Sequence, residues 1–470
     1  MPAQGAEGAH GVLIRADNGD VVTFDETGLT LRLSDTVLAD LRARLFGAPA
    51  EPAEVLGDID AWDLREADGW WRFTADLGEG GARGYQRPVA GGDILAAASG
   101  PLYGIFAIGG ARRAGFNPGG AAFGFHVLAP GDHIGAVGLE GTATAVPTER
   151  LQRLRYATRE SLIADTLLGW RRAHHQGLPL MLVRAETDGA GRIADLLDGP
   201  AFDNLLAAAD SLCAAAQALG KRPRALAVGI DYGLEDVGSD TAALLAGLRA
   251  LMAKIEREFS RRGLHRPIFF ATFESGSAEI GHHPVIRAHW QLAWQHGPHD
   301  LVFPAPAYMF DFDGFGRPSE AARARMAEMD AHALLARQNR APWLCPLFLL
   351  AESAGRAVRV TAQALADLVV DAADPFAAGP SCGFAIAGVE IERVAVASDD
   401  PRALILSCDR PPPPGAELTY ACDGAPTGDG RPANRGAIRD LWQAESRFGG
   451  APLHRWAYPA ALPIHPGGGA

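Results

Sequence analysis

The sequence predicts an α/β protein with a doubly wound parallel sheet, together with a small β-rich N-terminal domain and a C-terminal β-sandwich. From Pro101 to about Arg340, apolar runs alternate with amphipathic stretches, which indicates βαβ units and a parallel sheet. On either side of this region, apolar and polar residues alternate singly, as in antiparallel strands. We therefore expect three domains: residues 1–95, 96–341 and 342–470.

The elements of the central region follow from their apolar patterns. Buried strands are indicated by "PLYGIFAIGG", "PLMLVRAE", "RALAVGIDYG", "RPIFFATFES" and "HDLVFPAPAYMF". Helices are indicated by "AFDNLLAAADSLCAAAQALG", "DTAALLAGLRALMAKIEREFSRRG", "HPVIRAHWQLAWQHG" and "SEAARARMAEMDAHALLARQ". Ligands of such sheets bind at the carboxyl ends of the strands. The loop after each strand is therefore a candidate site.

The flanking regions carry strand and turn signals. "GVLIRADNGDVVTFDETGLTLRL" alternates around Asn18-Gly19 and predicts a hairpin, and a short helix with Ser34 as N-cap follows. "GWWRFTADLG" predicts another strand. After Pro342, "AVRVTAQALADLVVD", "GFAIAGVEIERVAVASDD" and "ALILSCDRPPPPGAELTYACD" predict a β-sandwich. "GRPANRGAIRDLWQ" and the tail after it are expected to be coil packed on the rest.

Bulk composition excludes several classes of function. A net charge of −13 argues against sequence-independent nucleic-acid binding and against an anionic membrane surface. The cysteines are odd in number and form no Cys-x-x-Cys, which indicates a reducing compartment. We expect synthesis in the cytoplasm without a signal peptide and no membrane insertion, because "MPAQGAEGAHG" has no basic and apolar leader and no apolar run is long enough to span.

The first strand is followed by a glycine turn and then by alanine, a residue without a reactive side chain. The apolar run stops at Gly109-Gly110, a turn of the kind that exposes a side chain or lets backbone approach a ligand, and Ala111 follows. "GGARRAG" lacks the Lys-Ser/Thr of a Walker loop and the Gly-x-Gly-x-x-Gly of a dinucleotide site. A phosphate cradle is therefore not expected here.

Three other loops hold polar residues. Glu186 and Asp188 follow the second strand, either as a turn that caps a helix or as part of a pocket. Tyr232 follows the third strand, between two aspartates. Asp313, in "YMFDFDGFGRPSEAARARM", either caps the next helix or faces the pocket.

The stretch "ATFESGSAEIGHH" suggests two further chemistries. Ser275 or Ser277 with His282 or His283 would supply a nucleophile and a base, but the stretch lacks Gly-x-Ser-x-Gly. Histidines 282, 283, 289, 296 and 299 raise a zinc hypothesis. His289 and His296 lie two helical turns apart, whereas zinc ligands usually lie at i, i+3 or i, i+4. We expect no metal and no cofactor.

Taken in order, these loops resemble the conserved blocks of the SGNH/GDSL hydrolase superfamily, in particular its sialate O-acetylesterase-like branch from phage and phage-derived proteins. The resemblance runs from about Pro101 into the last forty residues, where "GAELTYACD" and "NRGAIRDLW" are similar to that branch's closing elements. It implies an esterase with a serine nucleophile, a polar side chain that binds the oxyanion, and a histidine base.

This sequence departs from the family pattern at each of those positions. Ala111 stands where the nucleophile is expected, Tyr232 where the oxyanion amide is expected, and Gly316 where the histidine is expected. The glycine of the second block corresponds to Gly189 or Gly191. Acyl transfer needs all three groups, so we expect no enzymatic activity.

The resemblance implies that such a protein keeps a glycan-binding groove. We expect contacts to a sugar from Gly110, Ala111, Arg112, Glu186, Asp188, Tyr232 and Asp313. The expected partners are a capsule or lipopolysaccharide glycan and, through residues 1–95, other proteins of a phage-like particle or gene transfer agent. We also expect the protein to form a homo-oligomer. Release would then be on particles, as a head or tail spike.

Two alternative functions remain open at this point. The first is an active esterase with Ser275 or Ser277 as a displaced nucleophile, and the second is a structural particle protein that binds no ligand. Trp70 and Trp71 are core residues of the N-terminal domain or a second platform for a sugar.

Overall fold

The computed structural model describes residues 11–15, 21–25, 28–32, 56–78, 81–110, 112–138, 143–189, 192–236, 238–280, 284–313, 316–426 and 428–467. The chain divides into two compact units, Met1–Ala97 and Ala98–Ala470, and each is described by itself. The second unit contains both the α/β part and the C-terminal β part. The three-domain division with a boundary at residue 341 stays a prediction.

The first unit contains two antiparallel sheets. One consists of β1 (Gly11–Arg15), β2 (Val21–Asp25) and β3 (Gly28–Arg32). The other consists of β4 (Ala61–Ala67), β5 (Trp70–Ala75), β6 (Arg83–Pro88) and β7 (Leu95–Ala96). Trp70 and Trp71 are both half-buried on β5. The turn at Asn18-Gly19 and the helix expected after Ser34 lie outside the described residues.

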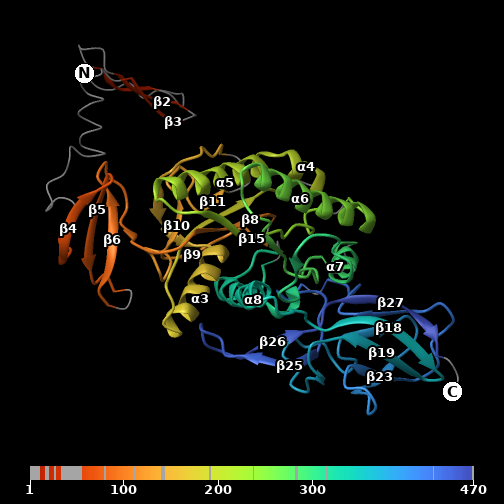
Figure 1. Cartoon of the computed structure of the whole chain (residues 1–470). Helices are drawn as coiled ribbons and strands as arrows, with labels where there is room; N and C mark the ends of the chain where they lie inside the picture. Colours follow the sequence, from red (N-terminus) through yellow and green to blue (C-terminus); the bar gives the residue numbers. More distant parts are fainter. Residues whose placement is uncertain are drawn as a thin grey trace. The chain divides into compact units, whose positions relative to one another are not determined.

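The second unit (Figure 1) is built on a mostly parallel sheet with the strand order β12-β10-β14-β8-β15-β16-β17. Its strands are β8 (Leu102–Gly109), β10 (Val127–Pro130), β11 (Val137–Gly138), β12 (Leu151–Arg153), β14 (Leu180–Thr187), β15 (Pro223–Gly229), β16 (Ile268–Phe270) and β17 (Leu301–Val302). β12 is antiparallel to β10, and β11 adds to the carboxyl half of β14. A short pair, β9 (Asn117–Pro118) with β13 (Tyr156–Ala157), lies off this sheet.

Helices cover both faces of this sheet because its strands are apolar on both sides. α3 (Arg159–Ala173) and α8 (Glu320–Gln338) pack on the face that carries Ile105. α5 (Pro200–Ala218) and α6 (Thr241–Arg261) cover the other face, where Phe106 meets Phe259 edge to face. α4 (Ile193–Asp198) and α7 (Pro284–Trp294) complete the set. This mixed α/β arrangement is the predicted fold class.

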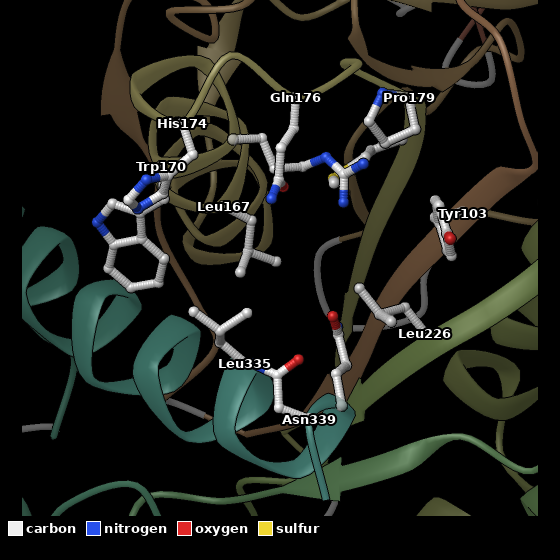
Figure 2. A pocket seen from close by; sticks show the side chains of 12 residues that line it. Tyr103, Leu167, Trp170, His174, Gln176, Pro179, Leu226, Leu335 and Asn339 are labelled. Atoms are coloured by element: carbon white, nitrogen blue, oxygen red, sulfur yellow. The ribbon is translucent and has the colours of Figure 1, made fainter. Parts of the chain in front are cut away.

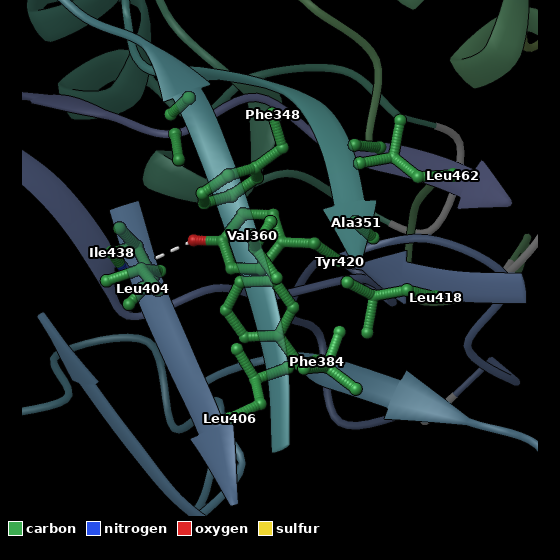
Figure 3. Packing of buried hydrophobic residues seen from close by; sticks show 14 of the residues in the cluster. Phe348, Ala351, Val360, Phe384, Leu404, Leu406, Leu418, Tyr420, Ile438 and Leu462 are labelled. Carbon is green, nitrogen blue, oxygen red and sulfur yellow. Dashed lines mark hydrogen bonds between the residues drawn. The ribbon is translucent and has the colours of Figure 1, made fainter. Parts of the chain in front are cut away.

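The C-terminal part consists of two sheets that share one core. The larger has the order β21-β24-β27-β18-β19-β23-β22 and the smaller the order β20-β25-β26. Phe348, Phe384 and Tyr420 pack at its centre (Figure 3). The strands are β18 (Leu347–Ala354), β19 (Ala357–Gln363), β20 (Leu368–Val370), β21 (Phe384–Ile386), β22 (Ile391–Val396), β23 (Ala403–Cys408), β24 (Glu417–Tyr420), β25 (Ile438–Ala444), β26 (Leu453–Trp456) and β27 (Ala460–Pro466).

The coil expected from Gly430 onward is wrong. β25 pairs with β20 and β26, and β27 pairs with β18 and β24 in the middle of the larger sheet. Ile438 is fully buried and its backbone amide donates to the Tyr420 hydroxyl at 3.1 Å. The neighbouring glycines and prolines hid these strands, because the long-range partners that complete their hydrogen bonding are not visible in the local sequence.

The five cysteines are all free thiols in the structure. Among the residues that the structure describes, no helix combines the length and the apolar character needed to cross a membrane.

Candidate functional site

The loops that follow the parallel strands are bonded to one another at the carboxyl edge of the sheet. The Gly110 amide donates to the Asp231 carbonyl at 2.9 Å, and the Asp188 amide donates to the Gly109 carbonyl at 2.9 Å. These bonds join the loops after β8, β14 and β15. The loop before α8 meets them through Gly316, where an added Cβ would lie 3.0 Å from Leu234.

The two glycines at the end of β8 allow close packing rather than the display of a reactive side chain. A Cβ on Gly109 would lie 2.1 Å from the Asp231 carbonyl oxygen, and one on Gly110 would lie 2.0 Å from Oε1 of Glu235. At Gly109 the close atom belongs to the backbone, so this position requires glycine. At Gly110 a larger residue would have to displace the Glu235 side chain. The Glu235 carboxylate therefore occupies the space over the turn.

A buried ion network lies beneath this turn. Asp231 forms an ion pair with Arg113, whose Nε lies 2.9 Å away, and accepts hydrogen bonds from Arg159 Nη1 at 2.9 Å and from the Thr272 amide. Arg159 also forms a two-pronged pair with Asp330, with distances of 2.6 and 2.8 Å. Arg113 extends the network to Glu160 at 2.8 Å. All these side chains are almost completely excluded from solvent.

The electrostatics of the network centre on Asp231. Burial alone would raise the pKa of its carboxyl group, but the adjacent Arg113 and Arg159 outweigh burial and lower it. The Arg113 guanidinium fits because residue 229 is glycine, where a Cβ would lie 2.2 Å from Nη2. The space beneath the loops at the carboxyl ends of the strands is thus filled by charged side chains, which form ion pairs with one another.

Of the residues expected to contact a sugar, several lie near this turn. Gly110 is in the turn itself, and Ala111 lies outside the described residues. Arg112 is 4% exposed and turns inward, with Nη2 2.5 Å from Glu274 and its guanidinium 3.8 Å from the Phe312 ring centroid. Tyr232 is also buried, and burial together with the nearby carboxylates, Glu235 foremost, raises the pKa of its hydroxyl.

The other three expected contacts are spread along the edge. Glu186 is fully buried on β14 against Arg184, at 2.5 Å, and burial raises the pKa of its carboxyl group. Asp188 is half-buried beside the turn. Asp313 is exposed and pairs with Arg317 at 2.8 Å, while Ser319 caps α8. The helix cap considered for Asp313 is therefore wrong, and the roles of these residues toward a ligand stay predictions.

The residues considered for a displaced triad are enclosed or undescribed. Ser275 and Ser277 are 0% and 1% exposed. The Ser277 hydroxyl accepts from the amides of Glu279 and Ile280, both at 3.2 Å, so it closes a local turn. His282 and His283 lie outside the described residues. Across the described ranges, no group of three or more His, Cys, Asp and Glu side chains is arranged to hold a metal ion.

An open pocket of about 390 Å³ lies beside this edge, and we call it the edge pocket. It is bounded by the loop after β10, by β12 and by the β9–β13 pair, whose neighbourhood is labelled in Figure 1. Its side chains are partly aromatic and partly polar. The main ones are Phe116, Asp132, His133, Gln152, Arg153, Arg155 and Tyr156.

A second cavity of about 350 Å³ lies toward the opposite edge of the sheet (Figure 2). Leu167, Leu226 and Leu335 face its interior, and His174, Gln176 and Asn339 lie around it. It is enclosed by the C-terminal ends of α3 and α8 and by the first residues of β8 and β14. This cavity is separate from the loops that carry the resemblance.

The sequence analysis missed the residues that build the ion network. Arg159 and Glu160 begin α3 and Asp330 lies on α8, far along the chain from the glycine turn. The edge pocket was missed as well. The sequence did contain a signal, because Arg112 and Arg113 follow shortly after a buried strand. Two charged side chains at such a place need buried partners of opposite charge.

The chain is similar in fold to solved esterases. A carbohydrate acetylesterase from Xanthomonas citri aligns over 77% of this chain and 86% of its own, at 12% identity and a TM-score of 0.46. A family two carbohydrate esterase from Clostridium thermocellum aligns over 53% and 68%, at 14% identity and a TM-score of 0.30. A peptidoglycan O-acetylesterase aligns over 52% and 93%, at 12% identity and a TM-score of 0.27.

No protein-family profile and no curated protein matches the sequence. At these identities and TM-scores, the likeness to solved structures concerns the fold and assigns no activity to this chain.

Proposed function

We propose that this protein is a catalytically inactive, SGNH-like glycan-binding protein. The observation that carries the proposal is the packing at the glycine turn. Ala111 replaces the nucleophile in the sequence, and the carboxylate of Glu235 lies against Gly110, beside the position where an ester would be attacked. A carboxylate at that place repels a developing oxyanion instead of stabilising it.

The remaining catalytic parts are also missing from their expected places. Gly316, next to Leu234, has no side chain that accepts a proton, and the Tyr232 hydroxyl is held among carboxylates. The buried Ser275 and Ser277 offer no exposed hydroxyl as a substitute. These features support binding without turnover.

Glycan binding is supported by the kinds of side chain exposed at the same edge. Tyr156 and Phe116 present aromatic surface, and arginine, histidine and glutamine side chains lie beside them in the edge pocket. Sugars are bound by flat apolar surface combined with a few polar groups that fix orientation.

In the cell, we propose that the protein acts as a spike or fibre of a phage-like particle or gene transfer agent that recognises capsule or lipopolysaccharide. Residues 1–95 would attach it to the particle or form a homo-oligomer. Purified particles analysed by immunogold electron microscopy would carry the label at a fixed structural position. Label confined to particle-free protein would contradict this role.

Calorimetric titration with O-acetylated polysaccharides, such as acetylated xylan and acetylated alginate, tests the proposed function directly. Binding without turnover gives a prompt heat that saturates. A continuing heat flow after each injection, accompanied by acetate release, would show hydrolysis and overturn the proposal of an inactive esterase. If no glycan in a broader panel gives a binding heat in the same titration, the proposal of glycan binding is itself overturned.

A further inference from the structure

The edge pocket presents a fixed aromatic pair to solvent. Phe116 and Tyr156 are 41% and 50% exposed, and their ring centroids lie 4.5 Å apart. The β9–β13 pairing holds Tyr156, which lies opposite Pro118, and Phe116 directly precedes β9. The Asn117 side chain, next to Phe116, donates to the Glu320 carbonyl at 3.2 Å. Two adjacent exposed rings offer a flat apolar surface on which a sugar ring can pack.

The polar side chains on the same wall are mainly cationic. Arg153 and Arg155 are exposed on and just after β12, the edge strand of the sheet. The Arg153 guanidinium lies 4.3 Å from the centroid of the Phe125 ring, which restrains its direction. His133 is exposed on the facing loop.

The carboxylate among the lining residues turns away from the pocket. Asp132 accepts from the amides of Ile134 and Gly135 at 3.0 and 2.7 Å and pairs with the buried Arg184 at 3.3 Å. Its side chain is 4% exposed. Among the described lining residues, Arg153 and Arg155 are therefore the exposed charged side chains, apart from the imidazole of His133.

From this arrangement we infer that the edge pocket binds an acidic sugar, a residue whose ring packs on Phe116 and Tyr156 and whose carboxylate pairs with Arg153 and Arg155. Guanidinium groups bind carboxylates through paired hydrogen bonds. The pocket volume of about 390 Å³ falls within the range of small-molecule sites. The inference rests on the proposed glycan-binding function and adds the class of sugar and its location.

The test compares acidic oligosaccharides with their neutral forms. Tetramers of galacturonate, mannuronate and glucuronate, and N-acetylneuraminate, are titrated into the full chain beside their carboxyl-reduced counterparts. We expect at least one acidic member to bind tenfold or more tightly than its neutral counterpart. R153A/R155A should abolish that preference, and Y156A should weaken both members of the pair.

A matched control separates the pocket from general charge effects. R224A/R393A removes two exposed arginines elsewhere in the second unit and should keep the preference. Thermal melts of each variant establish that folding is retained. Equal loss in the control, or a preference that survives R153A/R155A, would overturn the assignment to this pocket.

The inference and the proposed function fail in different ways. If no acidic sugar binds more tightly than its neutral form while a neutral glycan still binds, the acidic-sugar inference falls and glycan binding stands. If neither acidic nor neutral glycans bind to the full chain, both fall.

Discussion

At the residue scale, Asp231 holds the carboxyl edge together. Its carboxylate forms an ion pair with Arg113 after the glycine turn and accepts hydrogen bonds from Arg159 at the start of α3 and from the Thr272 amide after β16. Its own carbonyl accepts from the Gly110 amide. One side chain thus joins segments that are far apart in the sequence.

Asp231→Asn should destabilise the fold by about 3–5 kcal/mol, the usual cost of breaking a buried ion pair. The substitution keeps the shape of the side chain but leaves Arg113 and Arg159 without its charge. Urea unfolding measures the loss. Asp313→Asn, which removes an exposed partner of Arg317, serves as the control and should cost less than about 1 kcal/mol. Similar losses in the two variants would contradict the role of the network.

His332 should make stability depend on pH. It packs against Trp170, Trp343 and Trp442, and burial lowers its pKa from the ordinary 6.5 to about 4. Above pH 6.5, the pKa of this histidine in the unfolded chain, His332 leaves the free energy of unfolding unchanged. As pH falls from 6.5 toward 4, the free energy of unfolding decreases, because the unfolded chain binds a proton that the native state does not.

His332→Phe keeps an aromatic ring but cannot titrate, so urea unfolding between pH 7 and 4 should show a shallower loss of stability than wild type. Asp165 acts in the opposite direction, because burial raises the pKa of its carboxyl group from 3.8 to about 6. Between these two values the native state holds a proton that the unfolded chain has released, so this group makes stability fall as pH rises. Comparing the two proteins at each pH cancels the contribution of Asp165. Parallel pH profiles would contradict the assignment to His332.

At the element scale, α3 shows why one helix escaped the sequence analysis. From Arg159 to Leu168 every residue is buried, although half of these residues are polar. The polarity of the sequence therefore does not show which face of this helix is buried. Its N-terminus is nevertheless well defined, because Thr158 and Ser161 form a reciprocal capping box. The same burial brings Arg159 and Glu160 into the ion network.

Tyr420 fastens the smaller C-terminal sheet to the larger one. Its hydroxyl accepts from the Ile438 amide at 3.1 Å, and Tyr420→Phe would leave that fully buried amide without this partner (Figure 3). We expect a loss of about 1–3 kcal/mol. Chemical denaturation measures it, with Tyr103→Phe at a half-buried position as the control. No difference between the variants would argue against this link.

At the scale of the whole molecule, catalysis would need groups from three separate loops. Ala111→Ser adds a hydroxyl but supplies neither a base at Gly316 nor the side-chain amide that Tyr232 replaces. We therefore expect Ala111→Ser and wild type to hydrolyse p-nitrophenyl acetate at the same background rate. A clear rise over wild type, by tenfold or more, would show that the edge retains a working base.

Much of the fold was predictable, because periodicity reports burial. α6, α7 and α8 lie within the stretches that their apolar patterns indicate, α5 begins one residue before its stretch, and β14 and β15 are near the expected positions. The strands after Gly430 were not predictable, because their pairing partners lie far away in the sequence. For the candidate site, the convergence of the strand-end loops was expected, whereas the inward turn of Arg112 and the edge pocket were not.

The sequence by itself determined the alternation of strands and helices and the absence of a serine and a histidine at Ala111 and Gly316. Both are local properties, written in residue type and spacing. Tertiary structure alone decided that Arg113 and Arg159 share Asp231, that Glu235 lies on Gly110, and that Phe116 meets Tyr156. These contacts join segments distant in the chain, so they exist only once the sheet brings its strand ends to one edge.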